Sequence, residues 1–419
     1  MQMEKLAVFV SQHMSDDTAR LIMNRKRWPD IDMDMAVNCI ESRRKLKGKV
    51  QEWHDNPGLV FPLKLSAEQC SSSATGRYKA LLAERIADSA SGWSIADLTG
   101  GLGVDSWFFS MKAENVIYNE MQTPLCKAAR HNFKILEAAN ISIVNKTAES
   151  GNIGNILDGA DPDIIYMDPA RRGEGGRKVF LIEECTPDVL TLKDELFTFS
   201  RHILIKLSPM ADINMVCSRL GRNCREVHVV ASGGECKELL IWMDREWQDG
   251  YTITAVEIHN DGSVSEFTFS PSEEKTAKPL SLPGGGEMPI ADFCQQGGYL
   301  FEPGKAFMKA GAFNLISERF GISKLGSSTH YYIIENEDKA KELSRHGKIY
   351  RIIRCSPLDK RSIKAAGNDF PKAEVTARNI PMDTDTLRKK LGTSSGDDIH
   401  IFGLRSDKEG NLLFITSRL

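Results

Sequence analysis

The chain has 419 residues, of which 41% are hydrophobic and 26% are charged, and its formal net charge is −3. These values are typical of a globular protein of roughly two to four domains, and no stretch approaches the ~18 consecutive apolar residues of a membrane span. The cysteines form no CxxC pair and the N-terminal residues do not resemble a signal peptide, so we expect a cytoplasmic protein with no metal site, disulfide framework or membrane anchor.

The first part of the chain, residues 1–62, has apolar residues at helical spacing and is interpreted as an N-terminal helical region. A Pro-Gly pair within residues 56–58 ends this run. A further helix is expected over Ala67–Ala87, because Ser66 is a plausible N-cap and Gln69 completes a capping box three residues later.

From Trp93 onward, short apolar runs alternate with helix-length segments, which is typical of βαβ units around a parallel sheet. The last two of the apolar runs are separated only by residues 232–237, too few for a crossover helix, so they are predicted to form an antiparallel hairpin. The expected strands are Ser94–Leu98, Asn115–Asn119, Ser142–Asn145, Asp163–Met167, His202–Leu207, Glu226–Ala231 and Glu238–Met243.

The remaining chain predicts another hairpin and a small α+β tail. Residues 270–287 are rich in Pro, Gly and Ser and are interpreted as a linker, and a helical unit is expected over Lys305–Phe320. Residues 336–419 hold 17 Lys and Arg against 12 Asp and Glu. This net positive charge fits a polyanionic partner such as RNA, and it fits an ordinary solvated surface equally well.

The strongest motif is the segment Asp97–Asp105, DLTGGLGVD, which follows an apolar strand and leads into a helix. Glycines at the carboxyl end of a strand let the backbone approach a ligand closely. The pattern is not the dinucleotide fingerprint GxGxxG, because Ser106 stands where its last glycine would be.

Two further carboxylates follow later strands. Glu120 comes directly after a strand, 23 residues beyond Asp97, where a carboxylate can accept hydrogen bonds from both hydroxyls of a ribose. Asp168 and Pro169 follow the apolar strand that ends at Met167. Singly, each residue could be a helix cap, a solvated charge or a turn, but their order at successive strand ends favours one shared site.

The Asp97–Asp105 segment resembles motif I of S-adenosylmethionine methyltransferases, and Asp168-Pro169 resembles their catalytic motif IV. The segments QCSS from Gln69, RYKA from Arg77, DPARR from Asp168 and GRKVF from Gly176 look like a bacterial family of class I methyltransferases with a THUMP-like C-terminal domain. The tail segments YLFEPGKAFMKAGAF from Tyr299 and EVTARNIPM from Glu374 match it too.

The resemblance implies a Rossmann-like class I methyltransferase core at residues 63–275, a parallel sheet ending in an antiparallel hairpin. It also implies a small ferredoxin-like segment at 288–335 and a THUMP-like domain at 336–419. The cofactor would be S-adenosyl-L-methionine, with Asp97 toward its ammonium. The implied cofactor-binding residues are Asp97, Thr99, Gly101, Gly103, Asp105, Glu120, Met121, Thr147, Ala148 and Asp168.

For catalysis the resemblance implies Asp168, Pro169, Arg171 and Lys206. The DPAR sequence also resembles RNA uracil-C5 methyltransferases, which use a cysteine just after the fifth strand. Residues 206–210 here read KLSPM, so direct transfer to a nitrogen or oxygen is favoured over a covalent thiolate route. Arg171 stands where related enzymes have a base-stacking aromatic, and it could stack on a base or form a surface salt bridge.

Three hypotheses follow. The first is methylation of a nucleotide in structured RNA, either rRNA or tRNA, because true THUMP domains bind RNA. The second is methylation of a protein or a small molecule. The third is a non-catalytic RNA-binding protein with this fold, suggested by the departures from motif IV at Ala170 and Arg171.

Overall fold

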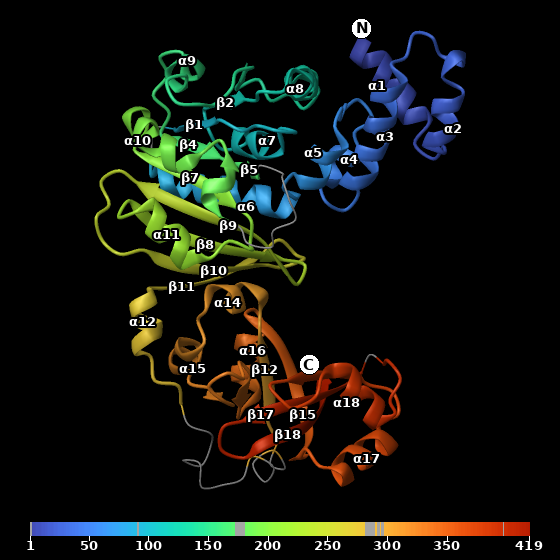
Figure 1. Ribbon diagram of the computed structural model, residues 1–419, viewed down its shortest axis with the longest axis vertical. Helices are drawn as coiled ribbons and strands as arrows, with labels where there is room; N and C mark the ends of the chain where they lie inside the picture. Colours follow the sequence, from blue (N-terminus) through green and yellow to red (C-terminus); the bar gives the residue numbers. More distant parts are fainter. Residues whose placement is uncertain are drawn as a thin grey trace. The chain divides into compact units, whose positions relative to one another are not determined.

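The computed structural model describes residues 2–89, 92–171, 181–280, 290, 294, 297–396 and 398–419 (Figure 1). The chain divides into two compact units, Met1–Ser232 with Lys237–Tyr251 and Gly233–Cys236 with Thr252–Leu419. Within the described part, none of the helices has the length and apolar character needed to cross a membrane.

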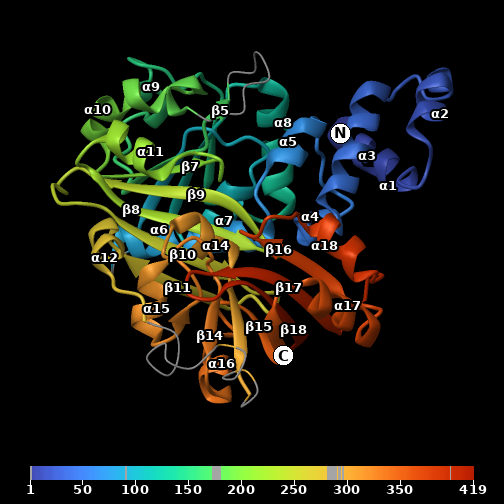
Figure 2. The ribbon, with the colours of Figure 1, turned by 60° about the horizontal axis from the view of Figure 1, so that its bottom comes forward.

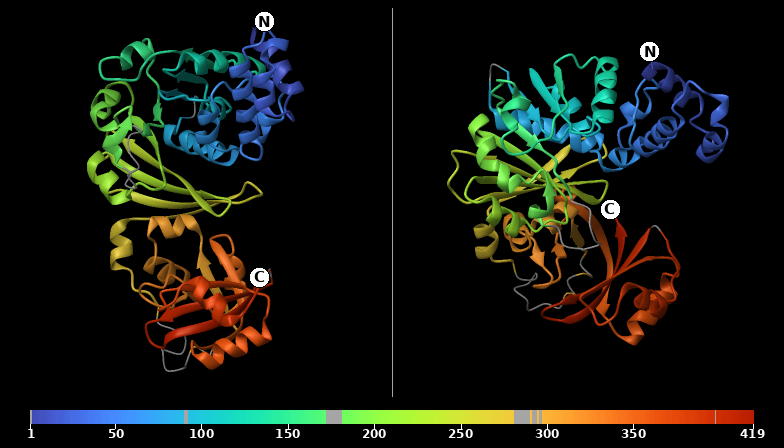
Figure 3. Two further views of the ribbon diagram at one scale, coloured as in Figure 1. Left: turned by 45° about the vertical axis from the view of Figure 1, so that its right-hand side comes forward. Right: turned by 45° about the horizontal axis from the view of Figure 1, so that its top comes forward.

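The N-terminal helices of the first unit pack around a core of their own, drawn in blue in Figure 3. Helix α3 is central to this group, and its residues Ala36, Cys39 and Ile40 are almost completely buried. Asp32 begins α3 by accepting a hydrogen bond from the Met35 N–H at 3.1 Å. The helices are α1 Gln2–Gln12, α2 Thr18–Met23, η1 Arg25–Arg27, α3 Met33–Leu46 and α4 Gln51–His54.

The prediction of a single helix over Ala67–Ala87 is wrong, because residues 70–72 are not helical and separate two helices. Helix α5 spans Lys64–Gln69, and α6 spans Ser73–Ala87. Ser72, not Ser66, is the N-cap of α6, and it forms a capping box with Thr75. The capping pair Ser72 and Thr75 lies six residues beyond the predicted pair Ser66 and Gln69. It was missed because the helical spacing of apolar residues continues through it.

The strands of the first unit form the predicted class I methyltransferase arrangement, in the order β8-β9-β7-β4-β1-β2-β3. Strands β1 to β4 and β7 pair in parallel, and β9 pairs with β7 antiparallel. The strands are β1 Ser94–Asp97, β2 Asn115–Asn119, β3 Ile141–Val144, β4 Ile164–Met167, β7 His202–Leu207, β8 Cys224–Ser232 and β9 Glu235–Asp244.

Helices cover both faces of this sheet. In Figure 1, α6, α7 and α8 lie on one side of the strands, and α9, α10 and α11 lie on the other. The central strands are therefore continuous apolar runs, and all four residues of β4 are buried. These helices are α7 Val104–Ser110, α8 Thr123–Ile135, α9 Ile153–Leu157, α10 Val189–Phe199 and α11 Ile213–Leu220, and short segments are β5 Ala170–Arg171, η2 Ile182–Glu184 and β6 Cys185–Thr186.

The second unit begins with the predicted hairpin, β10 Thr252–Ile258 and β11 Val264–Phe269, and contains a sheet in the order β13-β14-β12-β15-β18-β17-β16. Helices α17 and α18 lie together beside this sheet in Figure 2, and they cover a core that includes Ile363, Leu387 and Ile401. The other face of the sheet carries Leu300, Tyr350 and Phe402. The strands are β12 Tyr299–Pro303, β13 Ser323–Lys324, β14 Tyr332–Ile334, β15 Gly347–Pro357, β16 Glu374–Arg378, β17 Ile399–Ser406 and β18 Gly410–Arg418.

Parts of the second unit differ from the sequence prediction. The predicted linker begins with helix α12, Pro271–Thr276, because Ser270 and Glu273 form a capping box. Residues 281–287 of that linker lie outside the described residues. Gly311, with φ +83°, divides the helical unit predicted over 305–320 into two helices. The helices after α12 are α14 Lys305–Ala310, α15 Asn314–Phe320, α16 Glu337–Leu343, α17 Lys360–Asp369 and α18 Thr384–Leu391.

Candidate functional site

The carboxyl ends of β1, β2, β4 and β7 lie along one edge of the parallel sheet, where open α/β folds bind their ligands. Asp97 is the last residue of β1, and it pairs with Tyr118 of β2 and with Tyr166 of β4. Glu120 follows β2 directly, and Asp168 follows β4 directly. The sheet register therefore brings three predicted carboxylates to the same edge.

The glycine loop between β1 and α7 is shaped by the aromatic rings beneath it. A Cβ at Gly100 would lie 2.2 Å from the Tyr118 ring, and one at Gly103 would lie 2.8 Å from Phe133. Gly101 differs, because its φ is +52° and the nearest atom to an added Cβ would be the Thr99 carbonyl oxygen at 3.8 Å. The loop thus packs tightly below and leaves space beside Gly101.

Asp97 is buried and holds the start of the loop. Its Oδ1 accepts a hydrogen bond from the Thr99 N–H at 3.0 Å, and its Oδ2 accepts one from the Ser106 hydroxyl at 2.6 Å. Burial raises the pKa of Asp97 to about 7, and the neighbouring carboxylates of Asp105 and Asp168 contribute in the same direction. Both hydrogen-bond donors are neutral, so a cationic ligand would stabilise the ionised form.

Glu120 joins the second strand to the glycine loop. One carboxylate oxygen accepts the Gly101 N–H at 2.9 Å, and the other accepts the Gln122 N–H at 2.7 Å. The residue is 7% exposed. Each oxygen keeps a further lone pair, so Glu120 can accept additional hydrogen bonds.

Asp168 is linked to two other strand ends. Its backbone N–H donates to Thr99 Oγ1 at 2.6 Å, which joins the loops after β1 and β4. Its Oδ2 lies 2.5 Å from Nζ of Lys206, the penultimate residue of β7. Although burial opposes a charged lysine, Asp168 and two more distant carboxylates raise the pKa of Lys206 above its usual value. Lys206 is therefore a firmly charged partner of Asp168.

Asp105, in the first turn of α7, is enclosed by Ser71, Tyr166 and Lys79, none of which was among the predicted site residues. Its Oδ2 accepts hydrogen bonds from Ser71 at 2.9 Å and from Tyr166 at 2.8 Å. Its Oδ1 lies 3.4 Å from the ammonium of Lys79, which is fully buried. A charged residue on the buried face of a helix was the sequence signal for Lys79, because lysine is almost never fully buried without a partner.

The other predicted residues are less closely joined to this set. Met121 is 60% exposed, and Thr147 is also exposed, whereas Ala148 and Pro169 are buried. Arg171 lies in β5, which pairs with β6, but its side chain lies outside what the structure describes. Residues 172–180, which include the GRKVF segment, are not among the described residues either.

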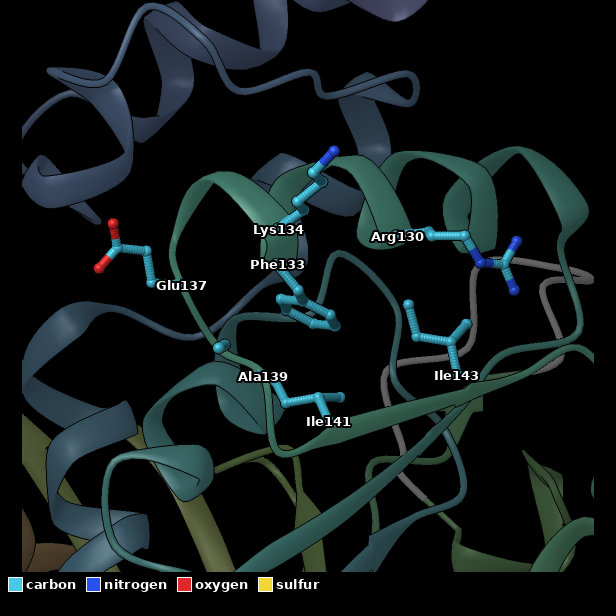
Figure 4. A pocket seen from close by; sticks show the side chains of 8 residues that line it. Arg130, Phe133, Lys134, Glu137, Ala139, Ile141 and Ile143 are labelled. Carbon is cyan, nitrogen blue, oxygen red and sulfur yellow. The ribbon is translucent and has the colours of Figure 1, made fainter.

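A separate hollow of about 430 Å³ lies between α8 and β3 (Figure 4). Phe133, Ile141 and Ile143 contribute apolar surface, and Arg130, Lys134 and Glu137 are charged. None of the predicted site residues lines it. Among the residues that the structure describes, no group of three or more His, Cys, Asp or Glu could hold a metal ion.

Comparisons with known proteins agree with this architecture. Residues 299–339 match a family model described as a ferredoxin-like domain, and residues 347–418 match one described as THUMP domain-like. A crystal structure described as a "putative methyltransferase" from Porphyromonas gingivalis W83 has a TM-score of 0.85 and 27% identity, covering 99% of this chain and 98% of that one. A search of curated proteins found no matching sequence.

Other solved structures match only part of the chain. An rRNA methylase from Streptococcus thermophilus has 9% identity and a TM-score of 0.29, covering 39% of this chain and 94% of that one. A "putative RNA methyltransferase" from Pyrococcus horikoshii has 16% identity and a TM-score of 0.28, covering 42% and 76%. TM-scores this low say nothing about the function of this chain.

The strand order and the glycine loop at the carboxyl edge define a class I methyltransferase fold. Over its full length the chain is similar in structure to the protein described as a "putative methyltransferase", and its C-terminal part matches a ferredoxin-like and a THUMP domain-like family model.

Proposed function

We propose that the protein is an S-adenosylmethionine-dependent methyltransferase that methylates a nucleotide in structured RNA, either rRNA or tRNA. The observation that carries the proposal is the shared strand edge, where Asp97, Glu120 and Asp168 surround the loop of Gly101 and are tied to it or to Thr99. The full-length similarity to the Porphyromonas gingivalis protein supports it.

The chain's own residues fit this cofactor. The space beside Gly101 lets the backbone approach a ligand, and Glu120 has lone pairs left for the two ribose hydroxyls. Asp97 has only neutral hydrogen-bond donors, and it suits a cationic ammonium group. We assign Thr99, Gly103, Asp105, Met121, Thr147 and Ala148 to the same cofactor site, with Thr147 and Ala148 on its adenine side.

When bound, the cofactor supplies an electrophilic methyl group on its sulfonium, so the protein mainly has to align the acceptor. Asp168 would accept a hydrogen bond from the acceptor nitrogen or oxygen and direct its lone pair. Lys206 holds the Asp168 carboxylate at 2.5 Å, and Pro169 restricts the turn that follows. Arg171 is assigned to contact with the target base or its phosphate.

Transfer is direct in this proposal, without a covalent bond to the protein. Cys70 is the cysteine whose surroundings include Lys206 and Asp105. Burial raises the pKa of its thiol, so the reactive thiolate is disfavoured at neutral pH. A nucleophilic addition to the base by this residue is therefore not part of the mechanism.

RNA is the proposed substrate because of the C-terminal part of the chain. Residues 347–418 match a THUMP-like domain, and residues 336–419 carry a net positive charge. We keep the division into a methyltransferase domain at 63–275 and C-terminal domains at 288–335 and 336–419 as part of the proposal. In this division the core performs the reaction, and the tail binds the RNA.

Calorimetry with S-adenosylmethionine tests the cofactor assignment. The intact protein should bind, and the Glu120→Ala variant should bind at least roughly 30-fold more weakly, since it loses hydrogen bonds to two hydroxyls. A matched control is Glu84→Ala, which removes a carboxylate that pairs with Lys112 on the surface. No binding by the intact protein at millimolar ligand would contradict the proposal.

The substrate is tested separately by mass spectrometry of modified nucleosides in RNA from cells that lack the gene. One methylated nucleoside should be missing, and the purified protein should restore it. Affinity for RNA should also fall steeply as salt increases. Cofactor binding without any RNA affinity at low salt would favour a protein or small-molecule substrate, whereas RNA binding without release of S-adenosylhomocysteine would favour a non-catalytic role.

A further inference from the structure

A cluster of buried charges joins α6, the first turn of α7 and β9, and it includes groups to which the proposed function gives no role. At its centre is Lys79 of α6, whose side chain is 0% exposed. Its ammonium donates to Glu238 of β9 at 2.6 Å and to the Ser71 hydroxyl at 2.9 Å, and it lies 3.4 Å from Asp105. Lys79 thus links α6 to β9, to the loop before α6 and to the first turn of α7.

The cluster extends to the strand that leads to Asp168. The Tyr166 hydroxyl donates to Asp105 Oδ2 at 2.8 Å, and Tyr166 is two residues before Asp168 in the chain. Ser71 donates to the same oxygen at 2.9 Å. Asp105 Oδ2 is therefore fixed by two hydroxyls, while Oδ1 has no hydrogen-bond partner and faces the positive charge of Lys79.

Lys79 also balances the charges around the site. Asp105, Glu238 and Asp168 are three carboxylates, and in the described part of the chain the ammonium groups of Lys79 and Lys206 contact them. Burial alone would raise the pKa of Asp105, but Lys79 and Lys206 lower it.

Stability alone is a weak reason for such a cluster. A buried ion pair is often no more stabilising than apolar residues of the same volume, because both ions lose their hydration. A fully connected polar network does, however, fix the orientation of its members. The two sequence segments QCSS and RYKA, which mark the family resemblance, supply Ser71 and Lys79 to this network.

We propose that Lys79 is a positioning residue of the cofactor site: it fixes Asp105 in place, and thereby holds the first turn of α7 and the glycine loop in the shape that binds the cofactor. The inference rests on the proposed function, because it assigns the role to S-adenosylmethionine binding. Lys79 acts through Asp105 and Ser71, and it does not itself contact the ligand.

The test is calorimetry of the full chain with S-adenosylmethionine and S-adenosylhomocysteine near neutral pH, combined with thermal unfolding. Lys79→Met should raise the Kd at least roughly 10-fold, and Lys79→Arg, which keeps the charge, should recover most of the affinity. Lys112→Met is the matched control, because Lys112 also bridges the α6–α7 region through Glu84, but on the surface. Its Kd should equal that of the wild type.

The number of binding sites distinguishes positioning from folding. A purely structural role would reduce the fraction of molecules that bind and leave the Kd of the folded ones unchanged, and that result would overturn the inference. If Lys79→Met does not fold, Ser71→Ala removes one hydrogen bond from both Lys79 and Asp105, and an unchanged Kd in that variant would overturn it as well. A wild-type protein that binds neither ligand would instead refute the proposed function, and the inference with it.

Discussion

Two buried carboxylates of the first unit, Asp97 and Asp244, lie at opposite ends of the strands of one sheet, and their pKa values are shifted in opposite directions. Each is about 1% exposed. Asp97 ends β1, whereas Asp244 pairs with His202 at the start of β7. Burial raises the pKa of Asp97 to about 7, while the pKa of Asp244 is lowered to about 2.

The difference comes from the charge of their partners. Burial alone would raise the pKa of Asp244 too, but hydrogen bonds from two arginines and a backbone N–H outweigh it. Arg201 Nε lies 3.0 Å from its Oδ1, and an Arg225 nitrogen lies 2.8 Å from its Oδ2. Asp97 accepts only a backbone N–H and a hydroxyl. The charge of Asp244 is thus neutralised by arginines of the chain itself, whereas the charge of Asp97 is not, so the site around Asp97 suits a positively charged ligand.

The largest expected effect is on the pH dependence of stability in Asp97→Asn. The native pKa is above the ordinary value, so the folded state keeps the proton between about pH 4 and pH 7, and stability falls as pH rises through that window. This slope amounts to up to about 4 kcal/mol, and the variant should lack it. Its amide oxygen can still accept the Thr99 N–H, and its NH2 group can donate to the Ser106 hydroxyl. Urea unfolding at both pH values measures it, and an identical slope in the variant would contradict the assignment.

Asp244→Asn should act in the opposite direction. The native pKa is below the ordinary value, so this carboxylate contributes about 2 kcal/mol above about pH 4, and the contribution is lost as pH falls toward 2. The variant should be less stable by about that amount near neutral pH, as measured by urea unfolding. Its S-adenosylmethionine affinity, measured below its unfolding temperature, should match that of the wild type.

Cofactor affinity should follow the ionisation of Asp97. If this carboxylate pairs with the ammonium of S-adenosylmethionine, the Kd should increase about 10-fold between pH 8 and pH 6, because the protonated form carries no charge. Calorimetry across this range measures the effect. In Asp97→Asn the affinity should be weaker and nearly independent of pH, and a retained pH profile would assign the titration to another group.

The smallest effect is expected from Thr99→Val, which keeps the shape of the side chain and removes the acceptor of the Asp168 N–H. The loss of one hydrogen bond should cost about 1 kcal/mol in stability. Methyl transfer to the RNA identified by nucleoside analysis should slow severalfold more than cofactor affinity falls, because Asp168 is proposed to contact the acceptor. Equal losses in both would show that the bond supports only the cofactor loop.

The strand order could be predicted from the sequence because its signals are local. The apolar runs that became β1, β2, β4 and β7 are short and bounded by polar residues, and the short gap between β8 and β9 required a hairpin. The glycine loop likewise followed from the DLTGGLGVD pattern. The roles of individual site residues stay predictions.

The sequence could not reveal contacts that join distant segments. Lys79 and Glu238 are 159 residues apart, and although Lys79 lies in the RYKA segment, nothing in the sequence indicates that these two side chains meet. The break between α5 and α6 was missed for a related reason, since Ser71 is held by Asp105, 34 residues further on. At this break a tertiary contact outweighed the local helical pattern.

The ring of Tyr118 determines the shape of the glycine loop before any ligand arrives. It fills the place of a Cβ at Gly100, and its hydroxyl donates to the Gly101 carbonyl at 2.6 Å. Binding at this loop therefore incurs little conformational entropy for ordering its backbone, which is the advantage of a preorganised receptor. Efforts to adapt the loop to bulkier cofactor analogues should accordingly leave position 100 unchanged and start from the open space beside Gly101.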